Sequence, residues 1–210
     1  MRRAMIIAAI AAVAMSAATG CRQATDVRMV KSQFDPNGTK MVIIPFRDRM
    51  SDYFESDDGG VVADHTGSYI SRHGITPVVY ERHFPSSVRT IYKANAAAPQ
   101  TAWKEIAEAL ACELVLVGQI ESISLGDPGG PKPKKGVMHL SARLLDVRQG
   151  CKVVWRMDQG KVVYPEEWEE ADLPVPIDRL SRKGLTRQLL MKAGEIVGKS
   201  FHDSPGLTGH

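Results

Sequence analysis

The chain has few aromatic residues, few cysteines and no excess of charge of one sign. Phe, Trp and Tyr make up 6% of its 210 residues, three residues are cysteine, and 27 Lys and Arg stand against 24 Asp and Glu. Nucleic-acid-binding domains usually carry a clear surplus of basic residues, so this balance argues against nucleic acid as a partner. A charged fraction of 24% is that of an ordinary folded domain.

Motifs for catalysis and metal binding are also missing. The sequence contains no G-x-S-x-G, no H-E-x-x-H and no phosphate-binding G-x-x-x-x-G-K motif. His65 and His73 lie eight residues apart, whereas two histidines on one helix face usually hold a metal at a spacing of four. We therefore expect no metal site, no cofactor and no enzymatic activity.

The first 20 residues have the pattern of an export signal. Arg2 and Arg3 precede an apolar run from Ala4 to Ala18, and a charged start, a short apolar middle and small residues at the end are typical of signal peptides. The run is shorter than the roughly 20 residues that a membrane-spanning helix needs. We predict that residues 1–20 are cleaved, which lowers the formal net charge from +3 to +1 because two arginines and no acids are lost.

The cysteine at this boundary predicts a lipid anchor. Ala18, Thr19 and Gly20 before Cys21 resemble the lipobox of bacterial lipoproteins, which implies diacylglycerol on Cys21. Each buried CH₂ contributes about 0.8 kcal/mol, so two or three acyl chains such as palmitate anchor a protein without spanning the membrane. In proteobacterial lipoproteins an Asp after the lipidated cysteine retains the protein at the inner membrane, so by this resemblance Arg22 implies the periplasmic face of the outer membrane. The alternative is a secreted protein in which Cys21 is incidental.

The remaining chain divides into a tether, one folded domain and a tail. Residues 21–40 are polar, lack hydrophobic periodicity and predict a lipidated tether. Residues 41–203 alternate between strand and helix patterns, which predicts a single α/β domain. Residues 204–210 predict a disordered tail.

The hydrophobic patterns predict the element order β-α-β-α-β-β-β-α. Short β-branched runs and alternating apolar residues predict strands over 41–46, 75–80, 113–125, 137–147 and 153–157. Apolar stripes predict helices over 61–73, 101–110 and 185–201, with Thr101 as an N-cap. The connecting segments 47–60, 81–100, 126–136 and 164–183 are expected to be irregular. The predicted fold is a mixed sheet with helices packed on it, in the α/β (α+β) class.

Four motifs in this order carry a family resemblance. They are MVIIPF at 41–46, SYISRHGITPVVYER at 68–82, ACELVLVGQI at 111–120 and ARLLDVRQGCKVVW at 142–155. Together they resemble the lipoprotein-associated α/β domain shared by the amino-terminal domain of TolB, the curli secretion lipoprotein CsgG and the penicillin-binding-protein activator LpoB. The resemblance implies a TolB-amino-terminal-like fold and an accessory or assembly role among envelope proteins.

Two surface features are candidates for contact with a partner. Trp168 lies within the acidic segment 166–172, and aromatic residues often anchor protein interfaces; the alternative is that it folds back onto the core. Lys132, Lys134 and Lys135 lie in a proline- and glycine-rich loop and are candidates for contact with an anionic surface. A solubilising hairpin tip is the alternative for these lysines.

Cys112 and Cys151 leave two readings open. An exported protein folds in an oxidising compartment, where the two thiols can pair, but two small hydrophobic residues in core positions are the more ordinary use of cysteine. The sequence does not bring them within bonding distance.

The sequence thus predicts a non-catalytic, lipid-anchored cell-envelope protein. Its expected partners are the membrane, through the lipid on Cys21, and other envelope proteins, with an accessory or assembly role like those of LpoB and CsgG. The alternative function is a cell-wall or other envelope enzyme whose site is scattered through the chain.

Overall fold

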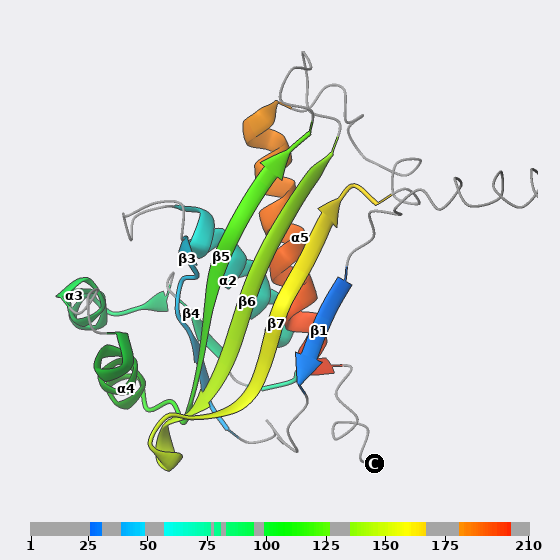
Figure 1. Ribbon diagram of the computed structural model, residues 1–210. Helices are drawn as coiled ribbons and strands as arrows, with labels where there is room; N and C mark the ends of the chain where they lie inside the picture. The colour runs from blue at the N-terminus through cyan, green and yellow to red at the C-terminus, as the bar shows by residue number, and fades with distance from the viewer. Residues whose placement is uncertain are drawn as a thin grey trace, which may run out of the picture.

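A seven-stranded mixed sheet forms the centre of the computed structural model (Figure 1). The structure describes residues 26–30, 39–48, 57–76, 78–80, 83–94, 99–126, 135–166 and 181–202. The strands are β1 (Asp26–Val30), β2 (Met41–Ile43), β3 (Arg47–Asp48), β4 (Val78–Tyr80), β5 (Leu114–Leu125), β6 (Gly136–Asp146) and β7 (Lys152–Tyr164). The helices are α2 (Asp57–Arg72), α3 (Ser86–Ala94), α4 (Pro99–Ala109) and α5 (Arg182–His202), and the short η2 (Val147–Gln149) joins β6 to β7. The predicted class, a mixed sheet with helices packed on it, is confirmed.

The two halves of the sheet differ in strand direction. The strand order is β1-β7-β6-β5-β2-β4, with β3 paired to β5 off this path. β2 pairs parallel with β4 and with β5. Parallel strands need a crossover connection, which α2 provides between β2 and β4 and which α3 and α4 provide between β4 and β5. β5, β6 and β7 form the predicted antiparallel meander, and β1 adds to β7 in the antiparallel direction.

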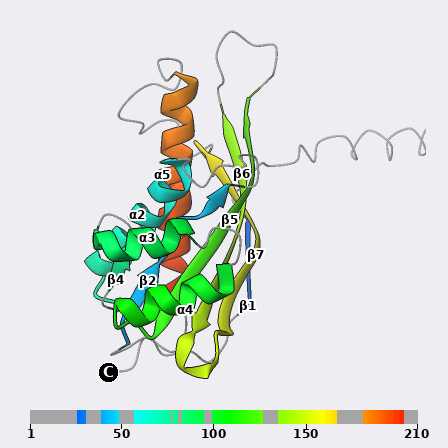
Figure 2. The same cartoon turned by 90° about the vertical axis from the view of Figure 1, so that its left-hand side faces the viewer.

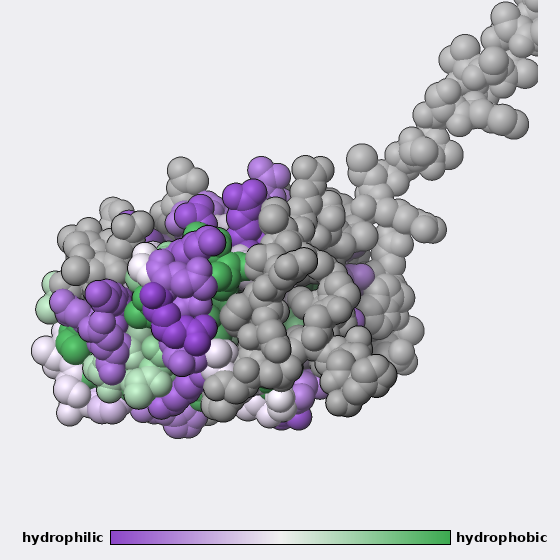
Figure 3. Space-filling view, turned by 90° about the horizontal axis from the view of Figure 1, so that it is seen from below, coloured by the Kyte–Doolittle hydropathy of each residue, from purple (hydrophilic) through white to green (hydrophobic). Residues whose placement is uncertain are grey.

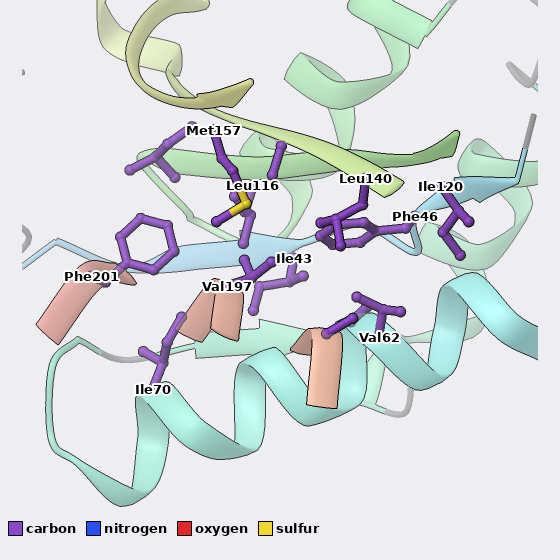
Figure 4. Packing of buried hydrophobic residues seen from close by; sticks show 14 of the residues in the cluster. Ile43, Phe46, Val62, Ile70, Leu116, Ile120, Leu140, Met157, Val197 and Phe201 are labelled. Atoms are coloured by element: carbon purple, nitrogen blue, oxygen red, sulfur yellow. The ribbon is translucent and has the colours of Figure 1, made fainter. Parts of the chain in front are cut away.

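One face of the sheet is covered by α2 and α5, and the larger core lies between them and the strands (Figure 4). Complete burial of one large apolar side chain contributes roughly 1.5–3 kcal/mol. The core side chains that Figure 4 labels come from strands, loops and both helices: Ile43, Phe46, Val62, Ile70, Leu116, Ile120, Leu140, Met157, Val197 and Phe201.

The two covering helices approach each other closely at a glycine. A Cβ atom on Gly194 of α5 would lie 2.6 Å from the Cβ of His65 and 2.7 Å from the carbonyl oxygen of Val62, both on α2. The buried Thr66 hydroxyl donates to the Val62 carbonyl at 2.8 Å and to the Gly194 carbonyl at 3.1 Å. Gly194 is therefore required for this helix contact, in which Thr66 also takes part.

The opposite face is covered only in part. α3 and α4 lie over the half of the sheet that contains β2 and β5, as Figures 1 and 2 show from two sides. There they bury a second, smaller core that includes Val42, Val88, Ile106, Val115 and Val117. On β6 and β7 none of the described helices covers this face, which we call the open face.

The structure differs from the sequence prediction at several elements. Residues 26–30, placed in the tether, form β1, and residues 86–94, expected to be irregular, form α3. Arg47–Asp48 forms the short strand β3 in a segment expected to be a loop. α4 begins at Pro99, so Thr101 lies inside the helix instead of capping it. α2 begins at Asp57 instead of residue 61, and β7 continues to Tyr164 instead of ending at 157.

Both described cysteines are free thiols. Cys112 is buried in the second core and Cys151 packs against that core half-buried. Burial raises the pKa of the Cys112 thiol to about 11, although Lys40 acts in the opposite direction. Cys112 is therefore protonated at neutral pH and behaves as a small hydrophobic residue. None of the helices in the described ranges is long and apolar enough to cross a membrane.

Candidate docking face on the open side of the sheet

The predicted contact residues fall mostly outside the described part of the chain. Cys21, Lys132, Lys134 and Trp168 lie outside the described residues, so their roles remain predictions. Lys135 is described, half-buried, directly before β6. Whether Lys135 lies near the other predicted residues stays untested, because they fall outside the described ranges.

The open face displays a polar surface that the strand alternation creates. Every second residue of β6 is buried toward α2 and α5, and the residues between them face the open side: His139, Ser141 and Arg143. An antiparallel sheet tolerates one solvated face because its backbone groups are paired within the sheet. The open face is therefore built on long central strands that the covered face holds in place.

Two β-bulges lie close to Ser141 on this face, one opposite Leu140 and His139 and the other opposite Ser141 itself. The pairing of β5 with β6 shifts between Ile120 and Ser122, at the position of Glu121. The pairing of β7 with β6 shifts beside Ser141, where Gln159 adopts a positive φ of 55°. A bulge adds one residue to a strand and redirects the side chains around it, so both neighbours of β6 change direction at the same level.

The redirected Glu121 is the centre of a hydrogen-bonded group. The Ser141 hydroxyl donates to Oε1 of Glu121 at 3.0 Å, and Nε2 of Gln119 donates to Oε2 at 3.2 Å. Both carboxylate oxygens therefore accept a bond from a neighbouring strand position. The hydroxyl of Ser141 donates to a carboxylate here, so the geometry is that of a fixed polar surface more than that of a serine activated by a histidine.

Two adjoining hollows run along the open face. One, of about 380 Å³, lies between α4 and the sheet, and its apolar part is lined by Trp103, Val117, Leu145, Cys151 and Val153. The other is wider and shallower, about 900 Å³, and is lined by polar residues of β5, β6 and β7. They share Glu121, Ser141 and Arg143. Val153 is 43% exposed, the one large hydrophobic residue in the described ranges that is exposed to this degree.

The charges on the open face are unevenly partnered. Arg143 lies directly opposite Arg156 in the β6–β7 register, and His139 lies directly opposite Lys161. Arg156 Nε contacts Asp158 Oδ2 at 3.0 Å. Cross-strand like charges destabilise a sheet, so the Arg143 and Arg156 pair is a cost that an anionic partner would relieve.

The turn at the end of this face is fixed by a buried carboxylate. Asp146 accepts hydrogen bonds from the backbone N–H and the guanidinium of Arg148 and from Nε2 of Gln149. Burial raises the pKa of Asp146, but the hydrogen bonds from Arg148 and Gln149 outweigh it and hold the pKa below its usual value. Arg148 also contacts Glu113 at 3.4 Å. From this end of the molecule, hydrophilic and hydrophobic side chains lie next to one another (Figure 3).

Sequence reasoning missed the residues at the centre of this face. The alternation of residues 137–147 indicated that Ser141 and Arg143 face away from the core, but Glu121, Asp158 and Lys161 join them only through the two bulges. No metal site is added by the structure, since the described residues contain no group of three or more His, Cys, Asp or Glu placed to hold a metal.

The chain is similar to solved structures but matches no known family by sequence. No protein-family model matches the chain, and no curated protein sequence matches it either. The fold is similar to that of PelC from Paraburkholderia phytofirmans, solved as a dodecamer, with a TM-score of 0.51, 16% identity and coverage of 83% of this chain and 98% of that one. At this identity the likeness shows the fold alone.

Two further structures have lower scores. Lipoprotein GNA1162 from Neisseria meningitidis has a TM-score of 0.42 and 14% identity, covering 77% of this chain and 99% of that one. The C-terminal domain of LpoB from Salmonella enterica has a TM-score of 0.37 and 12% identity, covering 64% and 84%. A TolB structure from Acinetobacter baumannii is also among the similar structures, with a TM-score of 0.36 and 15% identity. Scores this low carry no argument about function.

Proposed function

We propose that this chain is a non-catalytic, lipid-anchored cell-envelope protein, an accessory or assembly factor that binds other envelope proteins on its open sheet face. The observation that carries the proposal is the pair of adjoining hollows on that face. An apolar hollow containing Trp103 and Val153 lies beside a polar surface, and protein interfaces typically combine an apolar centre with a polar rim. The signal pattern and Cys21 support the envelope as the location.

Binding explains the open face better than catalysis does. The Glu121 carboxylate accepts hydrogen bonds at both oxygens from residues of the sheet itself, which holds it as a fixed acceptor. Aromatic and aliphatic anchors in a hollow with hydrogen-bonding groups around it are the features of a docking surface. Among the described residues, the envelope-enzyme alternative has no comparable arrangement in its favour.

The position of β1 limits how far the domain reaches. Asp26, the first residue of β1, is five residues after Cys21, and an extended chain covers at most about 3.6 Å per residue. A lipid on Cys21 therefore holds the β1 edge of the sheet within about 18 Å of the bilayer. This short connection keeps the domain close to its membrane, which favours partners in or near the same membrane.

The anchor is tested by Cys21→Ser. The substitution removes the thiol that carries the lipid, so we expect it to abolish labelling by radioactive palmitate and to release the protein from membranes. Cys151→Ser, which keeps the lipobox intact, is the matched control and should label normally. Labelling of the Cys21→Ser variant at the level of the unaltered chain would refute the anchor.

The docking face is tested by photo-crosslinking in the native host. A photoreactive amino acid at Lys161, on the open face, should give adducts with envelope proteins that mass spectrometry identifies. The same amino acid at Arg187, exposed on α5 at the opposite side of the sheet, should give few or none. Equal adducts from both positions would show that the open face has no special role.

A further inference from the structure

Two cationic side chains on the open face have no acidic partner within the described part of the chain. They are Arg143 and Lys161, whereas the carboxylates of the face are engaged: Glu121 accepts from Ser141 and Gln119, and Asp158 contacts Arg156. The face therefore offers unused positive charge together with the apolar hollow beside Trp103. A matching ligand carries carboxylates next to a large apolar group.

The chain itself contains a segment of that composition. Residues 166–172 read EEWEEAD, so Trp168 is placed between two pairs of glutamates. An indole suits the apolar hollow of about 380 Å³, and carboxylates on either side suit Arg143 and Lys161. The apolar hollow and the cationic part of the open face thus each have a complementary group within residues 166–172.

Trp168 cannot reach the apolar end of the hollow, at Val153, in its own copy. Glu166 is held on the other side of the sheet, where its Oε1 contacts Nζ of Lys192 on α5 at 3.0 Å. Trp168 is two residues further, at most about 7 Å away. The apolar end of the hollow lies at Val153, eleven residues back from Tyr164 along β7, which is roughly 36 Å at 3.3 Å per residue.

We propose that residues 167–172 of one copy dock on the open face of a second copy, with Trp168 in the hollow beside Trp103 and the glutamates facing Arg143 and Lys161. The contact joins two different surfaces, so repetition gives a ring if the rotation closes and a filament if it does not. This inference rests on one part of the proposed function, that the open face is a docking surface. It adds that the partner is a second copy of the chain.

A charge swap tests the contact directly. One full-length variant carries Arg143→Glu and Lys161→Glu, and the other carries Glu169→Lys and Glu170→Lys. Each variant alone brings like charges together, so we expect its self-association to weaken by at least about tenfold. When the two variants are mixed, every contact again joins opposite charges. Association should then return toward that of the unaltered chain.

The measurement uses two differently tagged full-length copies expressed together, with co-purification in detergent and mass photometry as readouts. The control variant carries Arg187→Glu and Lys199→Glu, two exposed reversals on α5, and should associate normally. Circular dichroism confirms that each variant is folded. Trp168→Ala should weaken association without any change of charge.

Three results would overturn the inference. They are a monomeric unaltered chain, a failure of the mixed variants to regain association, and capture by the open face of a different protein with no second copy. Each of these leaves the envelope role standing as long as Cys21→Ser releases the protein and Lys161 crosslinks to a partner. Conversely, a chain that associates as predicted but stays on membranes without Cys21 would refute the anchor alone.

Discussion

Leu140 and Ser141 are neighbours on β6 with opposite surroundings. Leu140 is fully buried under α2 and α5, whereas Ser141 is half-buried on the open face and donates to Glu121. The same strand thus serves two regions, a covered face held together by apolar burial and an open face held by hydrogen bonds between side chains. The covered face keeps the domain folded, whereas the open face is available to a partner.

The covered face also holds in place the strands on which the open face is built. Strands whose inner side chains are locked into a packed core keep their outer side chains at fixed positions. The bulges at Glu121 and Gln159 then set which polar groups meet. A docking surface built this way binds without first ordering itself, which reduces the entropic cost of association.

The largest effect in this comparison is expected from Leu140→Ala. It leaves a cavity under the covering helices, and truncations of this kind cost about 2–5 kcal/mol in the free energy of unfolding. Urea denaturation measures the loss. Leu140→Met keeps the volume and should cost less than about 1.5 kcal/mol. An equal loss for both variants would mean that volume at this position does not control stability.

A smaller effect is expected where the two covering helices touch. Gly194→Ala places a methyl group 2.6 Å from the Cβ of His65, so the helices must separate, at a cost of about 1–3 kcal/mol. Glu195→Ala is the control, because its side chain is exposed and surface changes usually stay within about 0.5 kcal/mol. A stability for Gly194→Ala equal to that of the unaltered chain would refute the close contact.

The covered face could be predicted from sequence, and the open face only in part. Apolar alternation on residues 137–147 and the apolar stripe of the last helix reveal which side chains face inward. The strand β1 was missed because its five residues, DVRMV, are too short to show a period. The bulges were missed because a register shift depends on both strands of a pair. Glu121 and Lys161 therefore gave no signal as parts of one surface.

On the open face, Ser141→Ala should have a moderate effect. The substitution removes one hydrogen bond to the Glu121 carboxylate, and a single such bond contributes about 0.5–1.5 kcal/mol. Ser124→Ala, at an exposed position of β5, should leave the free energy of unfolding nearly unchanged. Crosslinking from Lys161 should persist in both variants if Ser141 only shapes the surface. Its complete loss in a folded Ser141→Ala variant would give the hydroxyl a direct role.

The smallest effect is a pH dependence that arises on the covered face. Burial lowers the pKa of His65 from 6.5, Glu195 and Asp64 raise it in part, and Arg72 and Arg187 lower it further. Because the unfolded chain then binds the proton more readily than the folded one, stability is complete above about pH 6.5 and falls as the pH drops through the lowered pKa. Thermal unfolding between pH 7.5 and pH 5 measures this loss, as the difference between the unaltered chain and His65→Gln. If both chains lose stability equally over that range, the pH dependence comes from other groups and His65 is titrated alike in the folded and unfolded states.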